Sequence, residues 1–158
     1  MLESFFKRIL YIRISPQRLT IRDPRTGQEF SEIPEVAIAG EPAKIAAIGS
    51  KARSAVSGSG GKLVNPFAHP RSLVSDFTVA EQLLKIAVRQ EFGKPIFRPL
   101  PTIVMHPLGD PEGGFTQIER RALHELALGV GASKVVVRVG RELSDAELVS
   151  RAFESAPV

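Results

Sequence analysis

TIVMHPLGDPEGGFTQIERRALHELALGVGASKVVVRV, residues 102–139, is the stretch that decides the fold. It opens with a run of mostly apolar residues at Thr102–His106 and closes with a second one at Lys134–Val139, both typical of buried strands. Between them, Thr116–Leu128 carries apolar residues at helical spacing and ends before two glycines. A strand, a helix and a strand in this order predict two parallel strands joined by a right-handed crossover.

Capping boxes predict where the helices begin. In Thr116-Gln117-Ile118-Glu119 the first and fourth side chains can bond backbone N–H groups that the first helical turn leaves free. The segments Thr78-Val79-Ala80-Glu81 and Ser144-Asp145-Ala146-Glu147 have the same form. They predict two further helices, over Thr78–Glu91 and Ser144–Phe153.

The first half of the chain is richer in short alternating runs, which are typical of strands. Tyr11–Ser15 and Arg18–Asp23, separated by Pro16 and Gln17, are predicted to form a hairpin. Four further strands are expected here, at Gln28–Ile33, Glu35–Ala39, Lys44–Ile48 and Lys62–Val64. One short helix is expected at Ser50–Val56.

Composition limits the classes of function. The 158 residues fit one domain, and the absence of cysteine excludes thiolate catalysis and Cys-based zinc sites. The net charge of +4 permits an anionic partner, but one Tyr and no Trp make a nucleic-acid role unlikely. The three histidines lack metal-ligand spacing, and no serine lies in a G-x-S-x-G turn. We find no signal peptide and no apolar stretch of ~20 residues, so a cytoplasmic location is expected.

Four segments match one known family in order and spacing. Phe115–Ala122, followed by Gly129–Ala132, resembles the TQVERRA…GAGA segment of MreB, the actin-like, rod-shape-determining ATPase of bacteria. Ser75–Leu84, Pro34–Ile38 and Ala46–Gly49 are similar to the family's ADF-x-VTE-x-ML, EPSVVAI and AAVG stretches. The chain therefore resembles a truncated MreB that holds subdomain I only.

The resemblance implies an α/β fold of the actin-like (ribonuclease H-like) kind. We expect a half-domain with a mixed sheet flanked by helices and a small inserted subdomain near residues 35–75. Residues 11–158 would form this single subdomain, and residues 1–10 a separate amphipathic segment.

The first phosphate loop departs from the family pattern. MreB proteins carry IDLGTANT on the opening hairpin, where the Asp helps to hold the metal and the Gly-Thr backbone approaches the phosphates. The matching stretch here is IRISPQR, residues 12–18. Arg13 places a cation where Mg²⁺ requires a carboxylate, and Pro16 removes a backbone donor and forbids positive φ. A second loop of the DIGGGT type is not found before Val158, so we expect no cofactor, no metal and no enzymatic activity.

Glu119 matches the acid that MreB proteins use to orient the attacking water. It is also the fourth residue of the capping box that begins at Thr116. We predict the helix-cap role, and hence no catalytic residue in this chain.

The N-terminal segment MLESFFKRIL is a candidate for membrane contact. Its apolar residues follow the spacing of one helix face, with basic residues opposite, as in helices that lie in a headgroup layer. The predicted membrane-binding residues are Leu2, Phe5, Phe6, Lys7, Arg8 and Ile9. The alternative is that this stripe packs on the domain or merges into the first strand.

The predicted helix Thr78–Glu91 matches a family helix that contributes to lateral filament pairing. Its second apolar edge, Leu84 and Val88, is the predicted partner-binding surface, with ordinary core packing as the alternative. Two functions follow from these observations. One is a non-catalytic module that binds a full-length actin-like filament, another copy of itself or the inner face of the plasma membrane. The other is a residual ATP-binding half that another chain completes.

Overall fold

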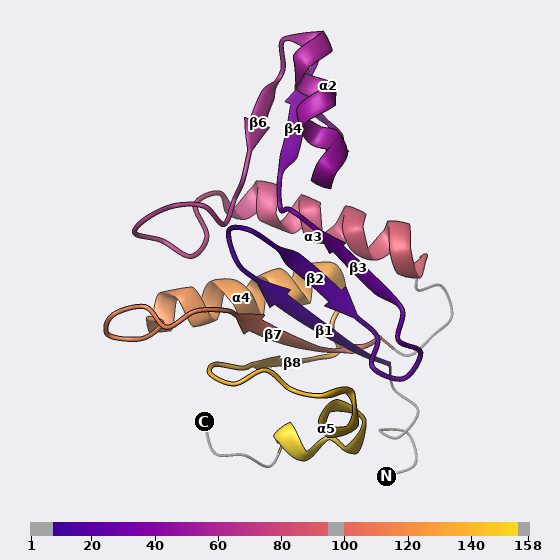
Figure 1. Ribbon diagram of the computed structural model, residues 1–158, viewed down its shortest axis with the longest axis vertical. Coiled ribbons are helices and arrows are strands. Elements are labelled where there is room, and N and C mark those ends of the chain that lie inside the picture. Colours follow the sequence, from indigo (N-terminus) through magenta and orange to yellow (C-terminus); the bar gives the residue numbers. More distant parts are fainter. Residues whose placement is uncertain (1–7, 95–99, 155–158) are drawn as a thin grey trace.

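The computed structural model describes residues 8–94 and 100–154, which form two sheets and the helices that cover them (Figure 1). The larger sheet has five strands in the order β3-β2-β1-β7-β8. These strands are β1 (Ile9–Ile14), β2 (Leu19–Arg22), β3 (Glu29–Glu32), β7 (Thr102–Pro107) and β8 (Lys134–Val137). β1 pairs antiparallel with β2 and parallel with β7, which pairs parallel with β8. The sheet is mixed, and the parallel unit predicted for residues 102–139 is confirmed.

A second, three-stranded sheet of order β5-β4-β6 is inserted between β3 and α3. Its strands are antiparallel, and one helix packs against β4 and β5. The elements of this insert are β4 (Val36–Ala39), β5 (Lys44–Ile48), the short 3-10 helix η1 (Gly49–Lys51), α2 (Ala52–Ser59) and β6 (Lys62–Val64). The insert projects from the rest of the fold beyond α3 (Figure 1). The predicted class, a mixed sheet flanked by helices with a small insert, is confirmed.

Helices cover both faces of the larger sheet. They are α3 (Phe77–Phe92), α4 (Gln117–Val130), α5 (Asp145–Ser150) and the 3-10 helix η2 (Ala152–Glu154). Because side chains alternate along a strand, β1 sends Leu10, Ile12 and Ile14 into the main core with α3 and α4. Ile9 and Tyr11 point to the opposite face, where they pack with residues of α5 and η2.

Two of the three predicted capping boxes are present. Thr116 and Ser144 each accept a backbone N–H of their helix, and the glutamate three residues later bonds back to the cap. The box predicted at Thr78 is wrong. Helix α3 begins earlier, because the Asp76 side chain accepts the backbone N–H of Val79 at 3.0 Å. Asp is a strong N-cap residue, and it takes the role that Thr78 would have had.

The prediction that Leu84 binds a partner is wrong. Leu84 is 0% exposed and belongs to the main core, whereas Val88 is partly buried against that core. Helix α3 packs against α4 as well as against the sheet, so its second apolar edge is also covered. A contact of Val88 with a partner stays a prediction.

Truncation of Leu84 should destabilise the protein more than truncation of Val88, because Leu84 lies in the core and Val88 is only partly buried. Leu84→Ala should lower the free energy of unfolding by about 2–5 kcal/mol, since it leaves a cavity in a closely packed core. Val88→Ala is the matched control and should cost about 1 kcal/mol, because the side chain is already partly solvated. Urea denaturation followed by circular dichroism measures both. Equal costs for the two variants would contradict the packing described.

Candidate functional site

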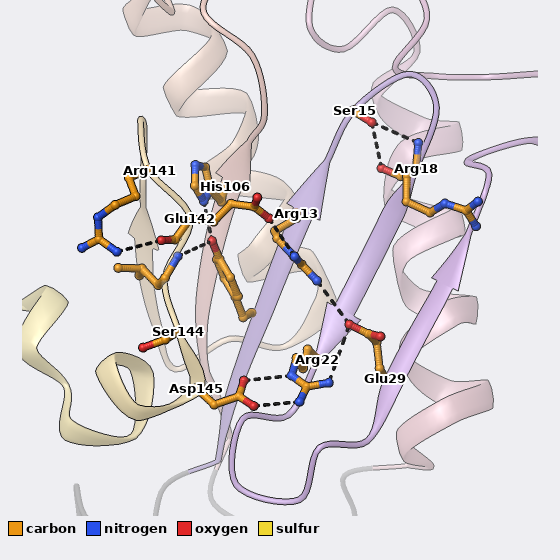
Figure 2. A network of polar contacts seen from close by, with 12 residues as sticks. Arg13, Ser15, Arg18, Arg22, Glu29, His106, Arg141, Glu142, Ser144 and Asp145 are labelled. Atoms are coloured by element: carbon orange, nitrogen blue, oxygen red, sulfur yellow. Dashed lines mark hydrogen bonds and ion pairs between the residues drawn. The ribbon is translucent and has the colours of Figure 1, made fainter.

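The β1–β2 turn is the segment that the sequence resemblance aligns with the family's first phosphate loop. The Ser15 N–H donates to the Arg18 carbonyl at 3.0 Å, and the Arg18 N–H donates to Ser15 Oγ at 3.0 Å. The carbonyl of Pro16 accepts from Asn65 Nδ2 at 2.8 Å, which ties the turn to the segment after β6. Figure 2 shows Ser15 and Arg18 facing each other across the turn. The N–H groups of Ser15 and Arg18 are therefore engaged within the turn itself.

A cavity of about 520 Å³ lies beside this turn. Its walls come from the turn, the segment between β6 and α3, the β7–α4 loop and the start of α4. Pro16 and Glu119 both line it, so the structure brings together the turn that departs from the family's phosphate-loop pattern and the carboxylate that matches its catalytic acid.

Glu119 uses its carboxylate to hold backbone. Oε2 accepts the N–H of Thr116 at 2.8 Å, and Oε1 accepts the N–H of Leu73 at 3.4 Å. The N–H of Glu119 in turn donates to Thr116 Oγ1 at 3.1 Å, which completes the capping box. The carboxylate of Glu119 thus caps the N-terminus of α4 and links this helix to the segment that precedes α3.

Arg13 lies on β1 and points to the α5 face of the sheet (Figure 2). Its Nη1 is 2.7 Å from Glu142 Oε1, and its Nη2 is 3.2 Å from Glu29 Oε1. The guanidinium carbon lies 5.5 Å from the centroid of the Tyr11 ring. At the position where MreB proteins carry a metal-holding Asp, this chain has a cation neutralised by its own carboxylates. Mg²⁺ prefers anionic oxygen ligands and would be repelled by the guanidinium, so these residues do not fit that metal.

Two more ion pairs extend this network. Arg22 binds Asp145 with both ends of its guanidinium, at 2.8 and 2.7 Å, and lies 3.8 Å from Glu29. The bonds from Arg22 lower the pKa of Asp145 below its usual range. Arg141 binds Glu147 at 2.7 and 3.1 Å. Arg13 and Arg22 fasten the segment after β8 to β1 and β2, whereas the pair Arg141–Glu147 lies within that segment.

A buried Tyr–His pair lies beneath the ion pairs. The Tyr11 hydroxyl meets His106 Nδ1 at 2.5 Å and accepts the N–H of Leu143 at 3.2 Å. His106 Nε2 lies 2.9 Å from the carbonyl of Gly140. Burial lowers the pKa of His106 and raises the pKa of Tyr11, so both side chains are neutral near pH 7. A neutral imidazole with its proton on Nε2 donates to Gly140 and accepts from Tyr11.

The residues predicted to bind membrane divide into two groups. Leu2, Phe5, Phe6 and Lys7 lie outside the described residues. Arg8 is half-buried, 3.5 Å from Asp23 and 6.0 Å from the Phe92 ring centroid, and Ile9 is 0% exposed in β1. For Ile9 the membrane prediction is therefore wrong, and Ile9 and Leu10 belong to the sheet and not to a separate segment 1–10. The described residues contain no helix long and apolar enough to span a bilayer.

Metal ligands do not gather in the part of the chain that the structure describes. Within residues 8–94 and 100–154, no three His, Asp or Glu side chains lie close enough together to hold a metal ion. Glu119, Glu142 and His106 are each engaged in the contacts given above.

The fold and the altered site together define a class. A mixed five-stranded sheet of order β3-β2-β1-β7-β8, helices on both faces and an inserted sheet after β3 form an actin-like (ribonuclease H-like) half-domain. The family model described as MreB/Mbl protein matches residues 26–143. The chain belongs to the MreB/Mbl family. The match begins beyond the hairpin that carries Arg13 and Pro16, where the sequence departs from the family pattern.

Individual relatives agree with this assignment. The chain is similar to the cell shape-determining protein MreB of Escherichia coli K12, with 33% identity over 98 residues, which cover 61% of this chain and 27% of the relative. Identity to the MreB of Haemophilus influenzae is 28% over 138 residues, covering 85% and 38%. The crystal structure of MreB5 of Spiroplasma citri bound to ADP superposes with a TM-score of 0.66 at 19% identity, covering 85% and 39%. The chain thus spans well under half the length of these relatives.

Reversal of the charge at Arg13 should destabilise the protein. Arg13→Asp removes both ion pairs and places a third carboxylate beside Glu29 and Glu142, for an expected loss of about 1–2 kcal/mol. Arg13→Met is the control, because it removes the charge but keeps the hydrocarbon chain, and it should cost less. Urea unfolding measures both variants. An Arg13→Asp protein as stable as the wild type would show that the cation does not matter at this position.

Acid should weaken the attachment of α5. Arg141, and then the Ser144 N–H, lower the pKa of Glu147 from its ordinary value of 4.5 to about 2. The folded state therefore binds fewer protons than the unfolded state between these values. The stabilisation by Glu147 is complete above pH 4.5 and is lost as the pH falls toward 2.

Glu147→Gln tests this because it keeps a capping amide and removes the charge. The wild type should be more stable than Glu147→Gln at about pH 5.5. The difference in stability between the two proteins should fall by about half at about pH 3. Thermal melting at the two pH values measures the difference. If the advantage is the same at both, the carboxylate does not titrate as described.

Proposed function

We propose that this protein is a non-catalytic interaction module of the bacterial cell-shape cytoskeleton, which binds a full-length actin-like filament of the MreB type. One observation supports the proposal: Arg13, which stands at the sequence position that resembles the family's metal-holding Asp, is paired with Glu29 and Glu142. Around this altered site the family fold is retained, at a TM-score of 0.66 to a solved MreB. A chain that keeps the scaffold and changes the metal position is suited to assembly more than to hydrolysis.

The site also argues against the second candidate, an ATP-binding half completed by another chain. Pro16 lacks an N–H, and the N–H groups of Ser15 and Arg18 are bonded within the turn. The carboxylate of Glu119 is engaged with Thr116 and Leu73. A nucleotide would have to displace these contacts before its phosphates could approach the backbone.

The place of action follows from the same proposal. A partner of the MreB type puts the protein in the cytoplasm at the inner face of the plasma membrane. Direct contact with lipid rests on the sequence pattern of Leu2, Phe5 and Phe6 alone, so it is a secondary part of the proposal.

Cosedimentation with a polymer of full-length MreB tests the proposal. The chain should pellet with the polymer and stay in the supernatant without it, with half-saturation at about 1–10 µM, in the range of a transient interface. A chain that stays in the supernatant under polymerising conditions would refute the filament-binding role.

Calorimetry with Mg-ATP separates the two candidates. The proposal expects no heat of binding at micromolar concentrations of the chain alone, and no heat beyond that of MreB itself when the MreB monomer is present. A saturable signal with micromolar affinity would favour the nucleotide-binding alternative and would show that the β1–β2 turn opens for phosphate.

A further inference from the structure

Strand β8 is an edge of the larger sheet with little protection. β7 pairs with one side of β8, and within residues 8–94 and 100–154 no strand pairs with the other side. Edge strands usually carry charges that prevent pairing with another chain. β3, at the opposite edge, has Glu29 and Glu32 in its four residues. β8 has Lys134 followed by three consecutive valines, each only partly buried.

A trough of about 620 Å³ runs along this edge. One wall belongs to α4 and is lined by Arg120, Arg121, His124 and Glu125. The other wall is formed by Phe153 and Glu154 of η2, with the valines of β8 between the two walls. The backbone edge of β8 thus lies at the floor of a groove between α4 and η2.

The two walls differ in chemistry. Val135 and Val137 face the main core beneath α4, whereas Val136 packs on the side of Phe153. On the α4 side, Arg120 and Arg121 form no ion pair with any carboxylate of the described residues. On the other side the charge is balanced, because Lys134 lies 3.2 Å from Glu154. One wall is therefore cationic, and the other is apolar with a neutralised rim.

We propose that β8 is a docking edge for an extended, acidic segment of a partner protein, which adds to the sheet as a sixth strand. Main-chain hydrogen bonds to the edge give such a complex its affinity, and alternate side chains give it specificity. Acidic side chains of the added strand would point to Arg120 and Arg121, and the apolar ones between them would point to Phe153. The inference does not depend on filament binding.

Charge decides against a second copy of this chain as the occupant. Two copies paired edge to edge about a two-fold axis would bring the arginines of both α4 helices to the same side of the joined sheet. Like charges held close together oppose that complex, whereas glutamates or aspartates at alternate positions favour the one proposed.

A labelled peptide of alternating glutamate and valine, EVEVEVE, is the probe. It should bind in a fluorescence anisotropy titration, shift the NMR amide signals of β8 and α4, and bind more weakly at high salt. The charge-reversed peptide KVKVKVK is the matched control and should not bind. No binding of EVEVEVE, or amide shifts confined to other parts of the sheet, would overturn the proposal.

Two variants test whether the α4 wall contacts the peptide. Arg121→Glu should weaken binding about fivefold or more, since it replaces an attraction with a repulsion. Arg89→Glu, an exposed arginine on α3, is the control and should leave binding unchanged. If both variants bind as the wild type does, the α4 wall is not the recognition surface.

The peptide backbone supplies the last test. Methylation of the three valine amides, or of the amides of the last three glutamates, removes donors from only one edge of an extended peptide. One of these two peptides should lose binding and the other should keep it. Equal binding of both would show that the peptide does not pair with β8. Dimers of the chain that exclude the peptide would show that a second copy is the occupant.

Discussion

The guanidinium of Arg13, held between Glu29 and Glu142, is the contact that fixes the segment after β8 to the first strand of the sheet. It joins the first strand to the third and to a segment 129 residues further along the chain. A buried or half-buried cation needs such partners, because an unpaired one loses the hydration that it has in the unfolded state. Once the carboxylates are arranged around Arg13, the position can no longer serve a divalent ion. The contact that stabilises the C-terminal segment therefore also leaves these residues unsuited to a divalent ion.

The alternation of β1 explains how one strand serves both the fold and this contact. Leu10, Ile12 and Ile14 join the core beneath α3 and α4. Tyr11 and Arg13 lie on the other face, where the Tyr11 hydroxyl bonds His106 and the backbone of Leu143. On that face the apolar contacts are few, so polar contacts of fixed geometry determine where α5 lies.

Part of the fold and of the candidate site could be predicted from the sequence, and part could not. Residues 102–139 predict a parallel unit because strand and helix periods are local, and Thr116 and Ser144 are visible caps for the same reason. Asp76 replaced Thr78 as a cap because two good candidates stood two residues apart. Leu84 and Ile9 were misjudged, because periodicity shows that a residue is apolar and not which neighbour covers it. The partners of Arg13 and Tyr11 depend on strand register and on a distant segment, neither of which leaves a local signal.

The two described parts of the chain that lie outside the family-model match are in contact with each other. The family model matches residues 26–143, so the opening hairpin and helix α5 both lie outside the match. These two unmatched parts touch each other: Arg22 binds Asp145, and Ile9 and Tyr11 pack with Leu148 and Phe153. Their contact indicates that the altered hairpin and the α5 segment form one unit, in which each supplies the charges and apolar surface that the other requires. The matched scaffold between them keeps the family fold and leaves the edge of β8 open.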